Sequence, residues 1–310
     1  MIEGGGTSRT RYPQALLKGL NTPWTSEYEL DTDIFVKHTN QLLAHGYTHL
    51  YVLGTAGEGY ALSDRAFRRI VDVFCDLMDG ADLHPQIGVI SLSVDHMLER
   101  IGYAAERGAG TFQIVLPSWG VMQSDEKVAF FRQVCGAFPE ANFLHYNYPY
   151  GMNTMAPAEY VMALEAVPNL VATKISTMDM GVVRGLMTQA GELQHFFLQG
   201  PFPYGCLYGE CSLISSLGPL FPEFSMELFE AGREGDVARA FRIQQRMLDV
   251  SAGLYAGVDR RHIDGAYDKL TSWLADPSFP RRLLPPFDPI SEEAAQVARR
   301  YYESSCSDLS

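Results

Sequence analysis

Short apolar runs alternate with segments of helical period along most of the chain. The segments between the runs repeat apolar residues every three to four positions, which predicts helices at 31–45, 63–78, 94–107, 124–138, 157–166 and 178–190. Ser63 can cap the second of these helices, with Asp64 in its first turn. The runs themselves predict eight buried strands, at 17–22, 49–53, 86–90, 111–116, 142–146, 170–174, 195–199 and 210–214.

Eight short strands separated by helices favour an α/β fold, a closed TIM (β/α)8 barrel. A doubly wound open sheet is the alternative, but no Gly-rich dinucleotide fingerprint follows the first strand. From residue 222 the pattern is helical, which predicts a C-terminal helical extension packed on the barrel. We therefore expect a flexible leader at 1–14, the barrel at 15–221 and C-terminal helices at 222–310, in a single structural unit.

Composition narrows the class of partner. The formal net charge of −13 over 310 residues argues against nucleic acid and anionic membrane surfaces. The first residues lack the apolar core of a secretory signal, and no apolar run approaches the roughly 20 residues of a membrane span. The five cysteines have no CxxC spacing, and the carboxylates do not cluster at ligand spacing. We therefore expect a globular protein of the cytoplasm, with no metal and no nucleic-acid or membrane partner.

Lys174 is the residue that stands out chemically. It ends an uncharged run, although burying an ammonium group costs several kcal/mol. A poorly hydrated lysine has a lowered pKa, and its free amine can attack a carbonyl carbon. Position alone also allows a strand-end lysine that extends its amine to water.

Other candidates follow neighbouring strands, at the barrel end where active residues gather. The loop 54–58 has two glycines that let backbone amides face an anion, with the Thr55 hydroxyl beside them. Tyr146 ends the fifth strand, where a phenol can move protons. Gly200 and Cys211 flank the loop between the seventh and eighth strands, where a ligand could approach the backbone. Ordinary turns and packing would explain the same residues.

Taken together, these motifs resemble a known family. Gly-Thr-x-Gly-Glu at 54–58, Tyr-Asn-x-Pro at 146–149 and a lysine 28 residues after the tyrosine are similar to the dihydrodipicolinate synthase / N-acetylneuraminate lyase family of class I aldolases. The opening segment 18–23 also looks like the first strand of that family. The resemblance runs from Leu17 to the end of the chain.

The resemblance implies an imine mechanism. Lys174 would attack the ketone of pyruvate or another 2-oxo acid, and Tyr146 would relay protons. The backbone amides of Ala56 and Gly57, with Thr55, would hold the carboxylate. The resemblance implies no metal or organic cofactor, and a homotetramer or homodimer.

Three positions depart from the synthase of that family. Ala56 replaces a second threonine. No phenol stands at 116–119, where the synthase has a tyrosine that serves a neighbouring subunit, and Gly151 replaces an arginine that grips a second carboxylate. These departures disfavour dihydrodipicolinate synthase activity.

Aromatic residues take the place of polar groups near the expected site. Trp119 and Tyr148 are candidate substrate-binding residues, together with rings at 150, 202 and 204. They favour a hydratase-aldolase with an apolar or aromatic second substrate. The same rings could instead fill a subunit interface. A 2-oxo sugar-acid dehydratase or aldolase, and a non-catalytic keto-acid-binding homologue, remain alternatives. His145 is expected to point away from the site and to serve packing.

Overall fold

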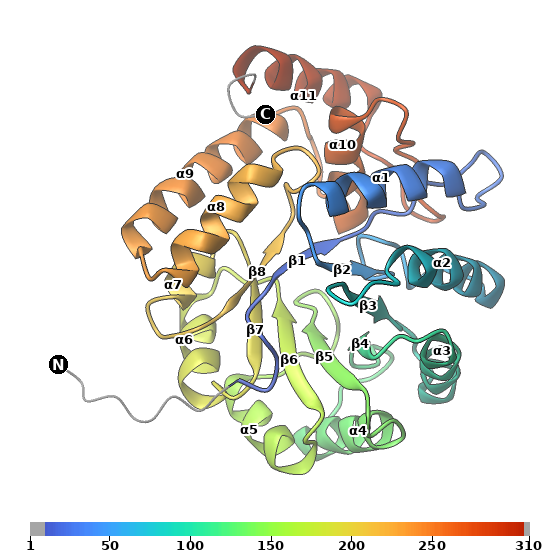
Figure 1. Ribbon diagram of the computed structural model, residues 1–310, viewed down its shortest axis with the longest axis vertical. Helices are drawn as coiled ribbons and strands as arrows, with labels where there is room; N and C mark the ends of the chain where they lie inside the picture. The colour runs from blue at the N-terminus through green and yellow to red at the C-terminus, as the bar shows by residue number, and fades with distance from the viewer. Residues whose placement is uncertain (1–9, 307–310) are drawn as a thin grey trace.

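Eight parallel strands close into a barrel in the computed structural model, which describes residues 10–306 (Figure 1). Strand β1 pairs with both β2 and β8, so the barrel has no free edge. The strands are β1 (Leu16–Gly19), β2 (His49–Val52), β3 (His84–Gly88), β4 (Thr111–Ile114), β5 (Asn142–Asn147), β6 (Leu170–Ile175), β7 (Gln194–Leu198) and β8 (Ser212–Ser215). The predicted (β/α)8 barrel is confirmed.

Helices follow each strand and surround the barrel (Figure 1). They are α1 (Thr32–Ala44), α2 (Asp64–Leu77), α3 (Val94–Glu106), α4 (Ser124–Gly136), α5 (Pro157–Ala166), α6 (Met180–Gln189), α7 (Phe202–Gly205) and α8 (Pro222–Arg233). Ser63 caps α2 as predicted, because its side chain accepts a hydrogen bond from the amide of Ala66. Helix α7 has only four residues, in agreement with the Pro- and Gly-rich sequence there.

The C-terminal extension consists of α9 (Val237–Leu254), α10 (Asp264–Ala275) and α11 (Glu292–Ser305). Helix α8 contacts β1 and β8, so it packs on the barrel as the helix that follows the last strand. In Figure 1, α9 lies along α8, and α10 lies near α1. The extension thereby reaches the loops that follow the first strands.

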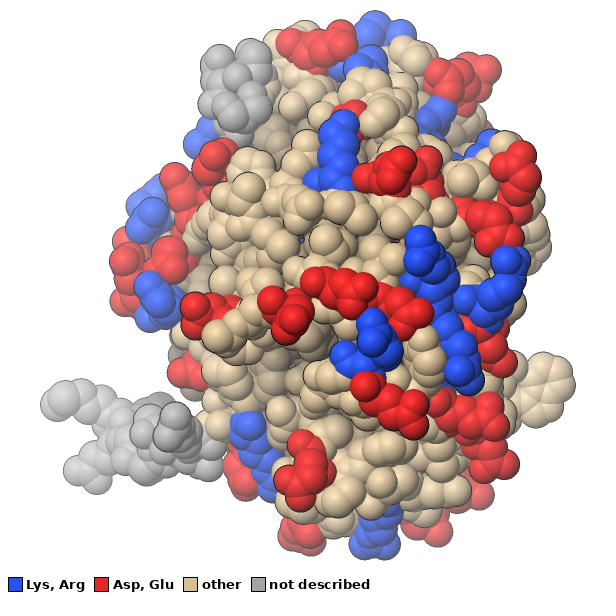
Figure 2. Space-filling view, turned by 45° about the vertical axis from the view of Figure 1, so that its right-hand side comes forward, with Lys and Arg blue, Asp and Glu red and all other residues tan. Residues whose placement is uncertain are grey.

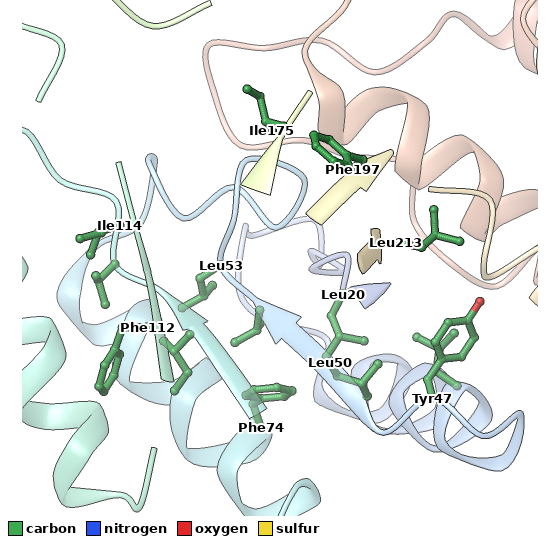
Figure 3. Packing of buried hydrophobic residues seen from close by; sticks show 14 of the residues in the cluster. Leu20, Tyr47, Leu50, Leu53, Phe74, Phe112, Ile114, Ile175, Phe197 and Leu213 are labelled. Atoms are coloured by element: carbon green, nitrogen blue, oxygen red, sulfur yellow. The ribbon is translucent and has the colours of Figure 1, made fainter. Parts of the chain in front are cut away.

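Alternation along the strands divides the core into two layers. Outward side chains such as Leu50 and Phe112 pack with Phe74 and other helix residues between the sheet and the helices (Figure 3). Inward side chains form a second cluster inside the barrel, which contains Leu17, Tyr51, Leu144, Phe196 and Ile214. Apolar residues on both faces of the sheet explain why the strands appear as continuous apolar runs in the sequence.

The chain is already packed before residue 15. The Tyr12 hydroxyl accepts a hydrogen bond from Gln86 at 3.1 Å, and the Arg11 guanidinium donates to the carbonyls of Leu164 and Val167. These contacts tie residues 10–14 of the expected leader to the barrel, while residues 1–9 lie outside the described part.

The surface bears both signs of charge. Figure 2 shows Lys and Arg side chains intermixed with Asp and Glu on the face in view. Within residues 10–306, no helix combines the length and apolarity needed to cross a bilayer. In the same range, no three His, Cys, Asp or Glu side chains come together as a metal site would require.

Candidate active site

Lys174 and Tyr146 stand side by side at the inner face of the barrel. They are direct partners in the register of β5 and β6, two residues beyond the inward Leu144 and Ala172. Because side chains alternate along a strand, all four share the inner face. His145 points the other way and bonds the Tyr160 hydroxyl at 2.7 Å between sheet and helices, as predicted.

The Lys174 amine is almost cut off from solvent. The side chain is 4% exposed, and burial lowers the pKa of the amine to about 8, while the negative charges of Asp264 and Asp268 act in the opposite direction. The amine nitrogen lies 3.8 Å from the centre of the Tyr146 ring. It therefore has the properties of a nucleophile that loses its proton near neutral pH.

A second phenol holds the amine directly. Lys174 Nζ donates a hydrogen bond to Tyr51 Oη at 2.6 Å. Two glycines make room for the Tyr51 ring: a β-carbon on Gly19 would lie 2.6 Å from one edge of the ring, and one on Gly54 would lie 2.4 Å from the other. The ring is thus fixed between two backbone segments, with its hydroxyl against the amine.

Tyr146 belongs to a small polar network. Its hydroxyl lies 3.4 Å from Ser176 Oγ and 3.5 Å from Asp264 Oδ2, and Thr55 Oγ1 donates to the same carboxylate oxygen at 3.1 Å. Burial raises the pKa of the Tyr146 phenol, and the negative charge of Asp264 raises it further. The phenol is therefore neutral at physiological pH and can give or take a proton through these partners.

The loop 54–58 turns sharply beside this network. Leu53 and Glu58 both adopt positive φ, at 64° and 57°. Within the described residues, the amides of Ala56 and Gly57 donate no backbone hydrogen bond, which leaves both for an anion. The Glu58 carboxylate points away from the loop and accepts hydrogen bonds from the Trp24 indole and the buried Lys269 amine.

A cavity of about 460 Å³ opens at this end of the barrel. Five residues singled out from the sequence line it together, namely Lys174, Tyr146, Thr55, Ala56 and Tyr150. Tyr150, Met178, Leu198 and Ile214 contribute apolar surface to its wall. The cavity is large enough for a pyruvate-sized molecule and a second fragment.

Lys18 and Asp268 line the same cavity next to the β8 end. Lys18 is only 2% exposed, and its stem passes Gly218, where a β-carbon would lie 3.0 Å from Lys18 Cδ. Burial lowers the pKa of the Lys18 amine and raises that of the Asp268 carboxyl to about 6. Within residues 10–306, neither charged group has a hydrogen bond or ion pair to another side chain. The two opposite charges act on one another, since Asp268 raises the pKa of Lys18 and Lys18 lowers that of Asp268, and both residues line the cavity.

The other predicted site residues lie around or outside the cavity. Gly57 does not line the cavity, and its carbonyl accepts a hydrogen bond from the Thr22 hydroxyl. Gly200 packs beneath Met178 of the cavity wall, since a β-carbon there would lie 2.7 Å from the sulfur. Cys211 is buried before β8, with its sulfur 3.7 Å from that of Cys206.

The aromatic candidates separate into different environments. The Tyr148 ring lies between the rings of Tyr146 and Tyr150, with centroid distances of 5.4 and 5.5 Å. Trp119 is 86% exposed and does not line the cavity. Phe202 is buried against α8, next to Gly232, outside the cavity. Of the five rings named from the sequence, Tyr150 is the one that lines it.

Sequence reasoning missed several cavity residues, among them Lys18, Tyr51, Asp264 and Asp268. Lys18 and Tyr51 lie in β1 and β2. In the sequence, nothing but their position along the strand separates them from residues that only pack in the core. Asp264 and Asp268 lie one helical turn apart on α10, a spacing that places them on one face. This four-residue spacing could have indicated a pair of carboxylates on one face of the helix, although such pairs usually face water.

The chain is similar to several known proteins. Residues 13–301 match the model of the dihydrodipicolinate synthetase family. A 4-hydroxy-tetrahydrodipicolinate synthase from Exiguobacterium sibiricum is 27% identical over 284 residues, which cover 90% of this chain and 92% of the relative.

Solved structures share the fold. YagE, a prophage protein of the dihydrodipicolinic acid synthase family from E. coli K12, solved with pyruvate, has a TM-score of 0.85 at 20% identity, with 94% of this chain and 97% of that chain covered. A catalytic lysine mutant of Ruminococcus gnavus sialic acid aldolase has a TM-score of 0.80 at 17% identity, with the same two shares covered.

Proposed function

Because the chain belongs to the dihydrodipicolinate synthetase family, we propose that it is a class I lyase that forms a Schiff base with pyruvate or another 2-oxo acid. The observation that carries the proposal is the Lys174 amine, which is buried, has a pKa of about 8 and lies against the Tyr146 phenol. Two similar proteins support the same chemistry, since YagE binds pyruvate and the sialic acid aldolase has a catalytic lysine.

The proposed reaction begins with the carboxylate of the 2-oxo acid at the loop 54–58. The amides of Ala56 and Gly57 and the Thr55 hydroxyl would hold it, and the ketone carbon would then face the Lys174 amine. Attack gives a carbinolamine, which loses water to form an iminium ion. The iminium draws electrons from the adjacent carbon, so a bond at the third carbon breaks or forms through an enamine. Tyr146 would move protons in each step.

The second fragment would occupy the part of the cavity that the 2-oxo acid leaves free. Tyr150, Met178 and Leu198 give that part an apolar wall, which supports the hydratase-aldolase reaction with an apolar or aromatic second substrate.

A second candidate is favoured by the opposite wall. Lys18 can donate and Asp268 can accept a hydrogen bond, and Ser215 and Ser216 line the same cavity. A hydroxyl group both donates and accepts, so a hydroxylated fragment would satisfy both charged groups. This arrangement supports the 2-oxo sugar-acid aldolase or dehydratase.

Dihydrodipicolinate synthase activity remains the less favoured alternative, although relatives have that name. Gly151 supplies no guanidinium for a second carboxylate. The C-terminal extension does bring one to the mouth, because Arg261 stacks on the Tyr150 ring at 3.7 Å. This contact is the structural reason to include the synthase substrates in any activity screen.

A screen for pyruvate release would test the proposal. Arylidene pyruvates, sugar-derived 2-oxo acids and 4-hydroxy-2-oxoglutarate would be incubated with the protein, and products would be identified by mass spectrometry. A lyase releases pyruvate, whereas a dehydratase gives a new 2-oxo acid without pyruvate. Lys174→Ala should abolish turnover of any active substrate. Reversible pyruvate binding without turnover of any compound would instead favour a non-catalytic keto-acid-binding protein.

We further propose that the protein works in the cytoplasm as a homotetramer or homodimer. The described cysteines form no disulfide, which suits a reducing compartment. Trp119 and Val121 are exposed apolar side chains close in sequence after β4, and a contact between copies would cover them.

A further inference from the structure

We propose that the Asp264 carboxylate takes up the proton that the Lys174 ammonium must lose, and returns it through Tyr146 to the hydroxyl that leaves as water. The inference rests on the proposed imine chemistry and gives it an internal proton store. Asp264 acts through Tyr146 and does not itself touch the reacting carbon. It is therefore a positioning and proton-holding residue.

The position of Asp264 carries the inference. The same oxygen, Oδ2, lies 3.1 Å from Thr55 Oγ1 and 3.5 Å from Tyr146 Oη, and the side chain lines the cavity. Helix α10 begins at this residue, and Gly265 lets the helix approach the substrate loop closely, since a β-carbon there would lie 3.2 Å from the Ala56 carbonyl oxygen. The carboxylate is thus fixed to the loop that would hold the substrate.

The enclosed amine creates the need for such a group. With a pKa of about 8, Lys174 is mostly protonated at pH 7, and an ammonium has no lone pair for attack. The side chain is too buried for bulk water to remove the proton freely. Lys18 and Asp268 also face the cavity, but neither has a hydrogen bond to Tyr146. Among the described residues, Asp264 is the carboxylate bonded to the phenol beside the amine.

With Asp264 as the acceptor, the proton transfers of imine formation balance without an acid or base from outside the site. First, the ammonium gives one proton to Asp264 by way of the Tyr146 hydroxyl, which leaves a neutral amine and a neutral carboxyl. Next, the nitrogen–carbon bond forms, and a second proton moves from nitrogen to the former ketone oxygen through Tyr146. Finally, the stored proton passes back to the carbinolamine hydroxyl, the carbon–oxygen bond breaks, and water leaves as the C=N bond forms. Asp264 is again a carboxylate, and the product is the iminium ion.

This arrangement also bears on the missing phenol at 116–119. In the synthase branch that the sequence resembles, a tyrosine from a neighbouring subunit stands in that region, whereas Trp119 here is exposed. Asp264 supplies the end of the proton path from the same chain. The site would then be complete within one protomer.

The test follows imine formation with pyruvate alone, by borohydride trapping and mass spectrometry of Lys174, across pH 6–10. Asp264→Asn should lower the maximal trapping rate at least tenfold, the lower range for lost proton transfer. It should also move the pH midpoint of the trapping rate below its wild-type value, because the Asp264 charge raises the pKa of the amine. Asp264→Glu should restore part of the rate.

Asp268→Asn is the matched control. It removes the same charge from the same cavity and also moves the midpoint downward, but it has no bond to Tyr146. Its maximal rate should exceed that of Asp264→Asn at least fivefold. Asp259→Asn, at an exposed position before α10, should change neither quantity.

Several results would overturn the inference. An Asp264→Asn rate within twofold of wild type would remove the proton-holding role. A midpoint that moves up toward the ordinary lysine value would show that the substitution only admits water. Equal rates for Asp264→Asn and Asp268→Asn would mean that both carboxylates act only through their negative charge, and that neither holds the proton. Absence of trapping on Lys174 in the wild-type protein would instead contradict the proposed function itself.

Discussion

The reactivity of Lys174 depends, at the residue scale, on the groups that surround one nitrogen atom. Burial removes hydration and lowers the pKa of the amine, while the carboxylates of α10 limit how far it falls. Tyr51 and Tyr146 flank the amine from β2 and β5. The Tyr51 phenol accepts a hydrogen bond from the nitrogen. The Tyr146 ring lies against the nitrogen, and its hydroxyl bonds the Asp264 carboxylate, which also accepts from Thr55.

Tyr51→Phe should lower the rate of imine formation about tenfold, because one hydrogen bond to a charged group contributes roughly 1.5 kcal/mol to its orientation. Timed borohydride trapping with pyruvate would measure this rate. Gly19→Ala should have an effect in the same direction, since its β-carbon would displace the Tyr51 ring. Gly110→Ala, where a β-carbon meets no atom within 4 Å, is the matched control. Wild-type rates in both Tyr51→Phe and Gly19→Ala would exclude an orienting role.

Tyr146→Phe should slow turnover by roughly 10²–10⁴, the usual scale of lost acid–base catalysis. The substitution keeps the ring against the amine and removes only the hydroxyl, so the structure should be retained. Steady-state assays on whichever 2-oxo acid proves active would measure the loss. A decrease below tenfold would mean that another group moves the protons.

At the scale of elements, helix α10 and the loop 54–58 form one functional piece. Glu58, the last residue of the loop motif, is fully buried and pairs with Lys269 of α10. Its carboxylate also accepts a hydrogen bond from Trp24 at 2.8 Å and another from the backbone amide of Leu284. The motif glutamate therefore anchors the substrate loop to the C-terminal extension, and the extension in turn brings Asp264 to the loop.

Glu58→Gln should destabilise the protein by about 3–5 kcal/mol, because it leaves the Lys269 charge buried without its partner. Denaturant unfolding would measure the change. The double substitution Glu58→Gln with Lys269→Met should recover part of the loss, since the unpaired charge is then absent. Glu230→Gln, in the exposed pair with Arg233, is the control and should change little. Equal stability of Glu58→Gln and wild type would contradict the anchoring role.

Helix α10 was predictable from the sequence, but the contact of its acidic face with the barrel was not. Its period predicted the helix, because Ala266 and Leu270 with their apolar neighbours form a regular stripe. The same pattern assigns Asp264 and Asp268 to a polar face, and polar faces usually meet water. Only the folded chain shows that this face meets the barrel mouth, because contact between residues 55 and 264 depends on the packing of the whole extension.

On the scale of the whole molecule, the barrel was predictable because most strand residues are buried, on both faces of the sheet, and the strands are therefore rich in apolar side chains. Lys174 and Tyr146 were predictable because a buried charge and a strand-end phenol depart from that background. Tyr51 was not, since an aromatic residue inside an apolar strand looks like core. Trp119 was expected near the substrate and is exposed, because nothing in a loop sequence fixes which way its ring turns.

The pH dependence of borohydride trapping of the imine on Lys174 is the most direct test of the mechanism. The protein would be mixed with pyruvate and borohydride between pH 6 and 10, and the modified residue would be identified by peptide mass spectrometry. We expect one adduct, on Lys174, that forms readily already near pH 8, because burial lowers the pKa of its amine to about 8. No adduct, an adduct on another lysine, or a rise delayed to the ordinary lysine pKa would contradict the mechanism.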